Sequence, residues 1–134
     1  MAIFDWDSSF ETGLDVMDFQ HKILFSRLVE LEKAILKNES KNKINHILSD
    51  LISYSLYHIK TEEDFFLNFD YKEKENHEKE HQFCKDYIYY ITKNFIKNDE
   101  KLNITEVLEL KERIFEHIKF LDKEFVNELK EHLQ

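Results

Sequence analysis

The chain has 134 residues, of which 42% are hydrophobic and 35% are charged, and its formal net charge is −9. This length suits one domain, residues 1–134, with enough apolar material for a single core. The acidic balance argues against a nucleic-acid partner, because phosphate binding depends on clustered Lys and Arg. A single glycine, Gly13, and the absence of proline argue against sheets and tight turns and favour long helices.

Signals for export and membrane insertion are also missing from the sequence. The first residues include Asp5, Asp7 and Glu11 and lack the apolar segment of a secretory signal. No run reaches the roughly 18 apolar residues that a membrane span needs. Cys84 is the only cysteine, so no disulfide can form within the chain. We therefore expect a cytoplasmic protein with no membrane partner.

Apolar residues recur every three or four positions in four stretches, which predicts four helices that each bury one face. An irregular arm is expected over residues 2–16. The helices are expected over residues 18–36, 41–68, 73–96 and 105–121, and a short terminal helix after residue 122. The segments between them are short, so consecutive helices should lie antiparallel. The sequence predicts an all-α, up-down-up-down four-helix bundle.

Each expected helix carries at least one histidine on the face that should be buried. A buried polar group without a partner costs about 1 to 3 kcal/mol, and an unpaired carboxylate costs more. In an antiparallel bundle, the starts of the first and third helices and the ends of the second and fourth share one end. Five histidines and two acids have this placement: His21, His58, Glu62, His77, His81, His117 and Asp122.

The spacing of these residues indicates a pair of metal ions. The two candidates on the second helix, and the first two on the third, are four residues apart and so project from one face. Asp122 follows His117 by five residues, about 140° further round an ideal helix, so we expect a π-like turn between them. Seven ligands exceed the needs of one ion, and two carboxylates can bridge two ions. Imidazole with carboxylate suits iron, zinc or manganese.

Other polar residues are expected to play no direct part in binding the ions. Glu63 lies about 100° from Glu62 on a helix, so it should face solvent or support a ligand. Cys84 is expected to act as a small hydrophobic residue. His46 and His132 stand in polar surroundings and are expected at the surface.

The pattern resembles hemerythrin, in particular the single-domain bacterial hemerythrins, over nearly the whole chain. The residues that carry the resemblance are the arm from Trp6 to Gly13, the segment 18–22, the seven candidates above, Glu63 and Phe83. It implies two iron ions joined by an oxo or hydroxo bridge. One iron would be bound by His77, His81 and His117, the other by His21 and His58, with Glu62 and Asp122 bridging both.

The same resemblance implies that the iron with two imidazoles keeps one open position, at which the family binds dioxygen reversibly in an apolar pocket. Candidates to line that pocket are Phe25, Tyr54, Phe65 and Ile114. We expect oxygen storage, delivery or scavenging and no enzyme activity, because ferritin-like di-iron enzymes carry mostly glutamates. Two alternatives stay open: an enzyme that consumes dioxygen, peroxide or nitric oxide, and an oxygen sensor.

The sequence departs from the family pattern at two positions. Arg113 stands one turn before His117, where the family usually has tryptophan, and Lys72 follows Tyr71 where a proline is usual. Arg113 could admit water near the pocket and hasten the loss of bound oxygen. The expected reading is that its stem lies on the bundle and its charged head reaches solvent.

Overall fold

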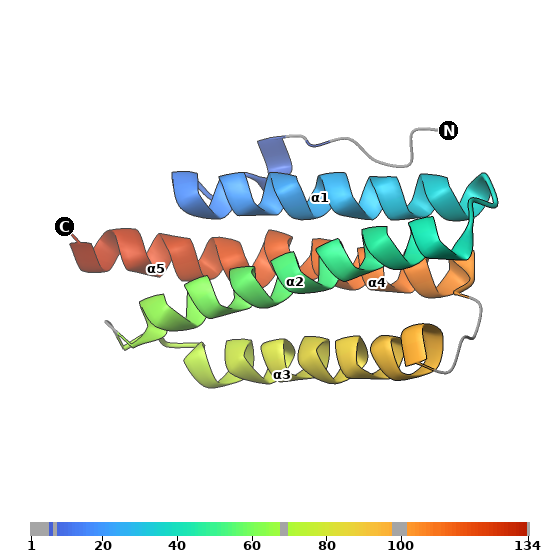
Figure 1. Ribbon diagram of the computed structural model, residues 1–134. Coiled ribbons are helices and arrows are strands. Elements are labelled where there is room, and N and C mark those ends of the chain that lie inside the picture. The colour runs from blue at the N-terminus through green and yellow to red at the C-terminus, as the bar shows by residue number, and fades with distance from the viewer. Residues whose placement is uncertain (1–5, 7, 68–69, 98–101, 134) are drawn as a thin grey trace.

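The computed structural model describes residue 6 and residues 8–67, 70–97 and 102–133. Within them, four long helical runs lie side by side in alternating directions (Figure 1). The elements are the 3-10 turn η1 (Ser8–Phe10), α1 (Asp15–Leu36), α2 (Lys41–Phe66), α3 (Lys74–Ile91) with the π segment η2 (Thr92–Lys97), and α4 (Ile104–Glu116) with the π segment η3 (His117–Asp122) and α5 (Lys123–Leu133). The predicted antiparallel four-helix bundle is confirmed.

Most helix bounds lie within two residues of the expected ones, and the start of α1 is the exception. Helix α1 begins at Asp15, three residues early, because the Asp18 carboxylate accepts hydrogen bonds from the backbone of Thr12 and Gly13 and fixes the chain before it. The expected end of the second helix, Asn68, lies outside the described residues. The terminal helix α5 continues α4 through η3 without a break.

Local side-chain bonds explain where the helices start and stop. Ser40 caps α2 by accepting from the Lys43 amide, and Asn103 forms a reciprocal capping box with Glu106 at the start of α4. After α1, Asn38 takes a positive φ of 54°, as residues that end helices often do. These short connections make consecutive helices antiparallel neighbours.

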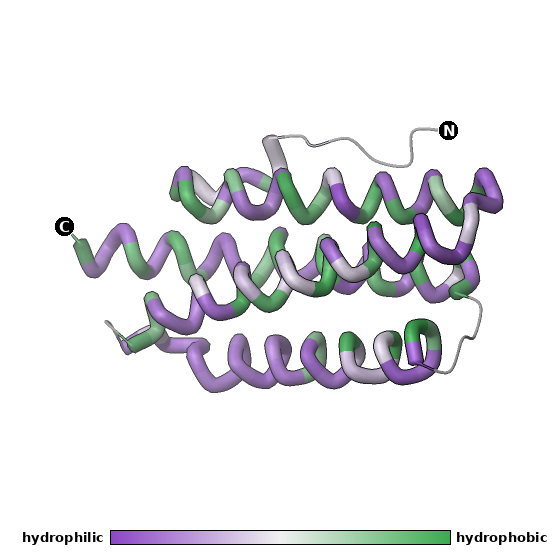
Figure 2. Tube along the Cα trace, viewed as in Figure 1, coloured by the Kyte–Doolittle hydropathy of each residue, from purple (hydrophilic) through white to green (hydrophobic). Residues whose placement is uncertain are grey.

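Two apolar clusters fill the bundle on either side of the histidine layer. The larger packs Leu24, Leu28, Leu31, Leu51 and others between the helices, and the smaller packs Met17, Phe66, Tyr71, Phe125, Val126 and Leu129 at the opposite end. Along each helix, hydrophobic and hydrophilic residues alternate in short runs, and the first half of α3 is largely hydrophilic (Figure 2). In the described part of the chain, no helix has the length and hydrophobicity to span a membrane.

Candidate metal centre

The seven side chains singled out in the sequence converge in one layer of the bundle. They come from α1, α2, α3 and η3, and at most a tenth of any of these side chains is exposed. All five histidines turn Nε2 toward the centre. The layer is closed on one side by Phe66, whose ring lies 5.1 Å from that of His77.

The first group of ligand atoms surrounds one oxygen of Glu62. Its Oε2 lies 2.8 Å from His81 Nε2, 3.0 Å from His77 Nε2 and 3.6 Å from His117 Nε2. These four residues offer one ligand atom each, and the four atoms all lie within 4.8 Å of one another. Three imidazoles and a carboxylate are therefore arranged around a common point.

The second group combines helices α1 and α2 with η3. Its members are His21, His58, Glu62 and Asp122, again with one ligand atom each within 4.8 Å. The Oδ2 atom of Asp122 lies 2.9 Å from His21 Nε2, and the Oε1 atom of Glu62 lies 3.0 Å from His58 Nε2. This group has two imidazoles where the first has three.

Each carboxylate faces both groups, one oxygen to each. Glu62 turns Oε2 to the first group and Oε1 to the second. Asp122 places Oδ1 3.0 Å from His77 and 3.1 Å from His117, while its Oδ2 is close to His21. This is the disposition that bridging carboxylates need in order to hold two neighbouring cations.

Several of these buried atoms have no hydrogen-bond partner among the described residues. They are Glu62 Oε1 and both carboxylate oxygens of Asp122. These three oxygens lie 2.9 to 3.1 Å from imidazole nitrogens, and buried carboxylates need compensating positive charge. Two divalent cations would satisfy them, and nitrogen with oxygen donors suits iron. The residues present fit a pair of iron ions.

The π segment η3 allows Asp122 to reach this layer. A residue five positions after His117 lies about 140° away on an ideal α-helix, but the wider π turn over His117–Asp122 returns it to the same side. The expected π-like turn is confirmed. Both residues then face the centre from one continuous helical run.

The buried acids and imidazoles of the layer shift one another's pKa values. Burial alone would raise the pKa of Glu62, but the imidazoles of His58 and its neighbours hold that pKa well below its usual value. Burial and the charge of Glu62 act to raise the pKa of Asp122, yet His117 keeps it low. Burial opposes the charged form of His117, and Asp122 nevertheless raises the pKa of His117 well above normal.

Two of the five histidines have a polar partner on the ring nitrogen that points away from the centre. His58 Nδ1 lies 2.6 Å from the side-chain oxygen of Gln20, whose amide donates to Thr61. His81 Nδ1 lies 3.2 Å from Glu63 Oε2. Glu63 was expected either to face solvent or to support a ligand, and it supports His81. The role of Gln20 was not expected, although a buried polar residue beside His21 is a signal for it.

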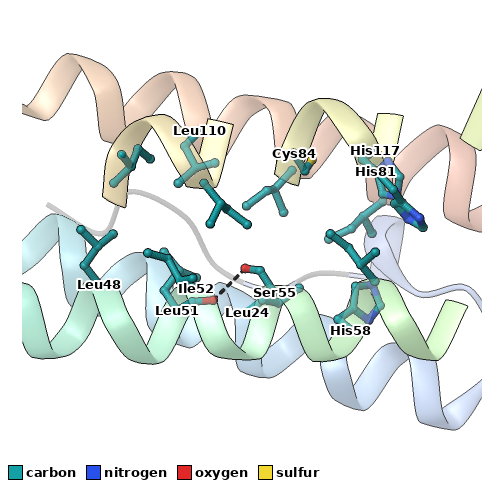
Figure 3. Close-up of a pocket in the computed structure, with 15 residues that line it drawn as sticks. Leu24, Leu48, Leu51, Ile52, Ser55, His58, His81, Cys84, Leu110 and His117 are labelled. Carbon is teal, nitrogen blue, oxygen red and sulfur yellow. Dashed lines mark hydrogen bonds between the residues drawn. The ribbon is translucent and has the colours of Figure 1, made fainter. Parts of the chain in front are cut away.

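An apolar cavity of about 60 Å³ lies against the layer. Figure 3 shows His58, His81 and His117 at one end of it and Leu48 at the other. The rest of its wall is Leu24, Leu51, Ile52, Ser55, Ile59, Cys84, Ile88, Ile91, Leu110, Ile114 and Ile118. We call this space the inner cavity. Its volume exceeds the roughly 10 to 15 Å³ that one water needs, so a diatomic gas fits.

Of the four residues expected to line an oxygen pocket, Ile114 lies on the wall of the inner cavity. The other three pack elsewhere. Phe25 contacts the arm through Trp6 and Phe10, Tyr54 pairs with Tyr57, and Phe65 packs on Phe125. Phe25 is buried, and Tyr54 and Phe65 are partly buried. Helical periodicity predicts which face of a helix is buried, but not which neighbouring helix that face contacts.

Arg113 lies at the surface between α3 and α4. Its guanidinium donates to Glu80 over 3.2 Å and stacks 3.7 Å above the ring of Phe83, and 40% of its side chain is exposed. Arg113 does not line the inner cavity, which Cys84 does. Burial raises the pKa of the Cys84 thiol, so this residue presents a neutral, weakly polar group to the cavity.

A four-helix bundle with two adjoining histidine and carboxylate groups that share an acid defines a histidine-rich metal-binding protein. The family profile described as "Hemerythrin HHE cation binding domain" matches residues 12–129. The chain therefore belongs to the hemerythrin family, and the resemblance inferred from the sequence is confirmed.

Individual relatives agree with this assignment. The chain is 32% identical over 109 residues to a bacteriohemerythrin of Clostridium acetobutylicum, covering 78% of this chain and 75% of the relative. It is 33% identical over 84 residues to a hemerythrin-like protein of Naegleria gruberi, covering 62% and 65%. A crystal structure of wild-type hemerythrin has the same fold, with a TM-score of 0.85 at 24% identity over 91% of this chain and 94% of that chain.

Proposed function

We propose that this chain is a single hemerythrin-like domain that binds dioxygen reversibly at two iron ions. The observation that carries the proposal is the pair of buried carboxylates that each turn one oxygen to either histidine group. A pair of ferrous ions supplies the two electrons that reversible dioxygen binding needs. His77, His81 and His117 would hold one ion, and His21 and His58 the other.

The unequal number of imidazoles supports a binding site at one ion. With Glu62 and Asp122 shared, the group that contains His21 and His58 has one ligand fewer than the other. A small ligand can enter where a protein ligand is missing. The inner cavity reaches this group at His58 and the other group at His81 and His117, so the difference in ligand number, not the cavity, favours one ion over the other.

The inner cavity favours binding over catalysis because its wall offers almost no protons. Apart from the three imidazoles, its polar groups are Ser55 and Cys84. The Ser55 hydroxyl donates to the Leu51 carbonyl over 2.7 Å, as the dashed line in Figure 3 shows, and burial raises the pKa of the Cys84 thiol. A dry apolar wall of this kind disfavours side reactions that consume protons.

The proposal is tested by the oxygen balance of the anaerobically reduced, iron-loaded protein. We expect an iron count of two per chain, uptake of one dioxygen per iron pair, and return of the gas under vacuum with reversal of the absorption change. Continuous oxygen consumption in the presence of reductant would instead identify an enzyme. A protein that holds iron and takes up no oxygen would also reject the proposal.

We expect Ser55→Leu to slow both the entry and the release of dioxygen several-fold. The larger side chain would narrow the inner cavity one turn from His58. Among the described residues, the Ser55 hydroxyl bonds the Leu51 carbonyl of its own helix, so its loss leaves no group on another helix unpaired. Stopped-flow absorbance measures both rates. The matched control is Ser49→Leu on the exposed side of α2. Equal rates in wild type and Ser55→Leu, with iron content unchanged, would show that gas uses another route.

A further inference from the structure

The five histidines differ in the hydrogen-bond partner of Nδ1, the ring nitrogen that points away from the centre. His21, His77 and His117 bury Nδ1 without a hydrogen-bond partner among the described residues. His58 and His81 each have one, Gln20 and Glu63. Each histidine group thus contains one supported imidazole, and the two supports differ in charge: a neutral amide on one side and a carboxyl group on the other.

Glu63 is built into a small network that fixes its position. Its Oε2 lies 3.2 Å from His81 Nδ1, and its Oε1 accepts from Lys85 Nζ at 3.4 Å. Glu63 is adjacent to Glu62 on α2, so the same helix turn presents one acid to the centre and the other to the back of His81. A third of the Glu63 side chain is exposed.

The direction of the His81 ring decides what Glu63 can do. Nε2 faces the centre 2.8 Å from Glu62, so an imidazole that binds a metal through Nε2 carries its proton on Nδ1. That proton points at Glu63. A carboxylate in this position fixes the tautomer and ring orientation and makes the imidazole a stronger donor.

We propose that Glu63 is a positioning residue that makes the two ion sites unequal, by strengthening His81 as a donor to the three-histidine ion. Gln20 orients His58 in the same way but adds no charge. The group that contains His81 would therefore bind its ion more tightly, and would favour the ferric over the ferrous state more strongly, than the group that contains His58. This inference rests on the proposed di-iron centre and adds to it an assignment of unequal roles.

The first test titrates metal-free protein with Co²⁺ and follows the absorbance of the bound ion. Removing a group that supports a metal-bound histidine typically costs about 10- to 100-fold in affinity. We expect a loss of that size at one of the two sites in Glu63→Ala, and a smaller loss in Glu63→Gln, which retains an acceptor for His81. Asp64→Asn is the matched control, because this neighbouring acid pairs with Lys60 away from the layer.

A second test separates charge from packing through the reduction potential of the iron-loaded protein. Glu63→Gln removes a negative charge behind one imidazole and should raise the potential, because it disfavours the ferric state. Gln20→Glu adds a charge behind the other imidazole and should lower it. A purely structural role predicts no such opposite shifts.

The inference is overturned if Glu63→Ala and Asp64→Asn bind Co²⁺ alike, or if Glu63→Gln leaves the potential at the wild-type value. Circular dichroism of the metal-free variants checks that the bundle is intact, and Glu63→Gln keeps the size of the side chain should Glu63→Ala fold poorly. These outcomes are independent of oxygen binding. A wild-type chain that binds two Co²⁺ ions, but whose iron-loaded form takes up no dioxygen, would reject the proposed function and leave the role of Glu63 standing.

Discussion

Glu62→Gln is expected to reduce the iron content of purified protein from two ions per chain to nearly none. Glu62 is the acid that both histidine groups share, with an oxygen at 2.8 Å from His81 and another at 3.0 Å from His58. The amide keeps the volume of the side chain but removes the charge, and it turns an NH₂ group toward one set of imidazoles. Iron analysis and the absorption change on exposure to air would both report the loss.

The comparison that isolates this effect is Asp64→Asn. Asp64 lies on the same helix, its side chain is 58% exposed, and it pairs with Lys60 at 3.2 Å. Its loss removes the same charge from the same turn without touching the layer, so two ions should remain. Retention of both ions by Glu62→Gln would mean that the carboxylate is not needed to hold them, and the proposed bridging role of Glu62 would fail.

Much of the candidate centre could be predicted because, in a helix, the spacing of residues in the sequence determines the directions in which their side chains point. Residues four apart on α2 and α3 project from one face, and short loops bring the ends of successive helices to one level. Even the exception was informative, because the five-residue step from His117 to Asp122 required a wider turn, and η3 supplies it. A buried layer of imidazoles leaves a strong signal in sequence because polar rings otherwise avoid the core.

The surroundings of the centre were harder to foresee. Periodicity says that a side chain is buried but not which of the neighbouring helices it meets, and that depends on helix rotation and crossing. Phe25 therefore faces the arm, and Phe65 faces Phe125, instead of the inner cavity. Gln20 escaped notice because an amide beside a ligand in the sequence points, by helix geometry, about 100° away from it. Only the neighbouring α2 brings His58 within its reach.

Removing the iron is expected to lower the melting temperature by roughly 20 °C or more. Each of the two ions, at a thousandfold excess over its dissociation constant, contributes about 4 kcal/mol, and in a domain of this size each kcal/mol shifts the midpoint by about 4 °C. Chelation leaves Glu62 and Asp122 buried among imidazoles with orphaned oxygens. Calorimetry of iron-loaded and chelated protein measures the difference, and a chelated protein that melts at the same temperature would contradict it.

The effect of pH on the chelated protein follows from the pKa shifts in the layer. His77 and His117 have raised pKa values in the folded chain. Their contribution to the free energy of unfolding is therefore complete below the ordinary histidine pKa of 6.5 and is lost as the pH rises through the raised values. Glu62 and Asp122 have lowered pKa values in the folded chain. Their contribution to stability is therefore complete above the ordinary pKa values of 4.5 for Glu and 3.8 for Asp, and it is lost on acidification.

The chelated protein should therefore be most stable between about pH 4.5 and 6.5 and weaken toward pH 8. Iron binding has the opposite preference, because it needs imidazoles that have lost their protons. The gap between the two melting temperatures should widen from pH 6 to pH 8. A gap that narrowed over this range would mean that protons and iron do not compete for the same histidines, and the seven side chains would then need another explanation.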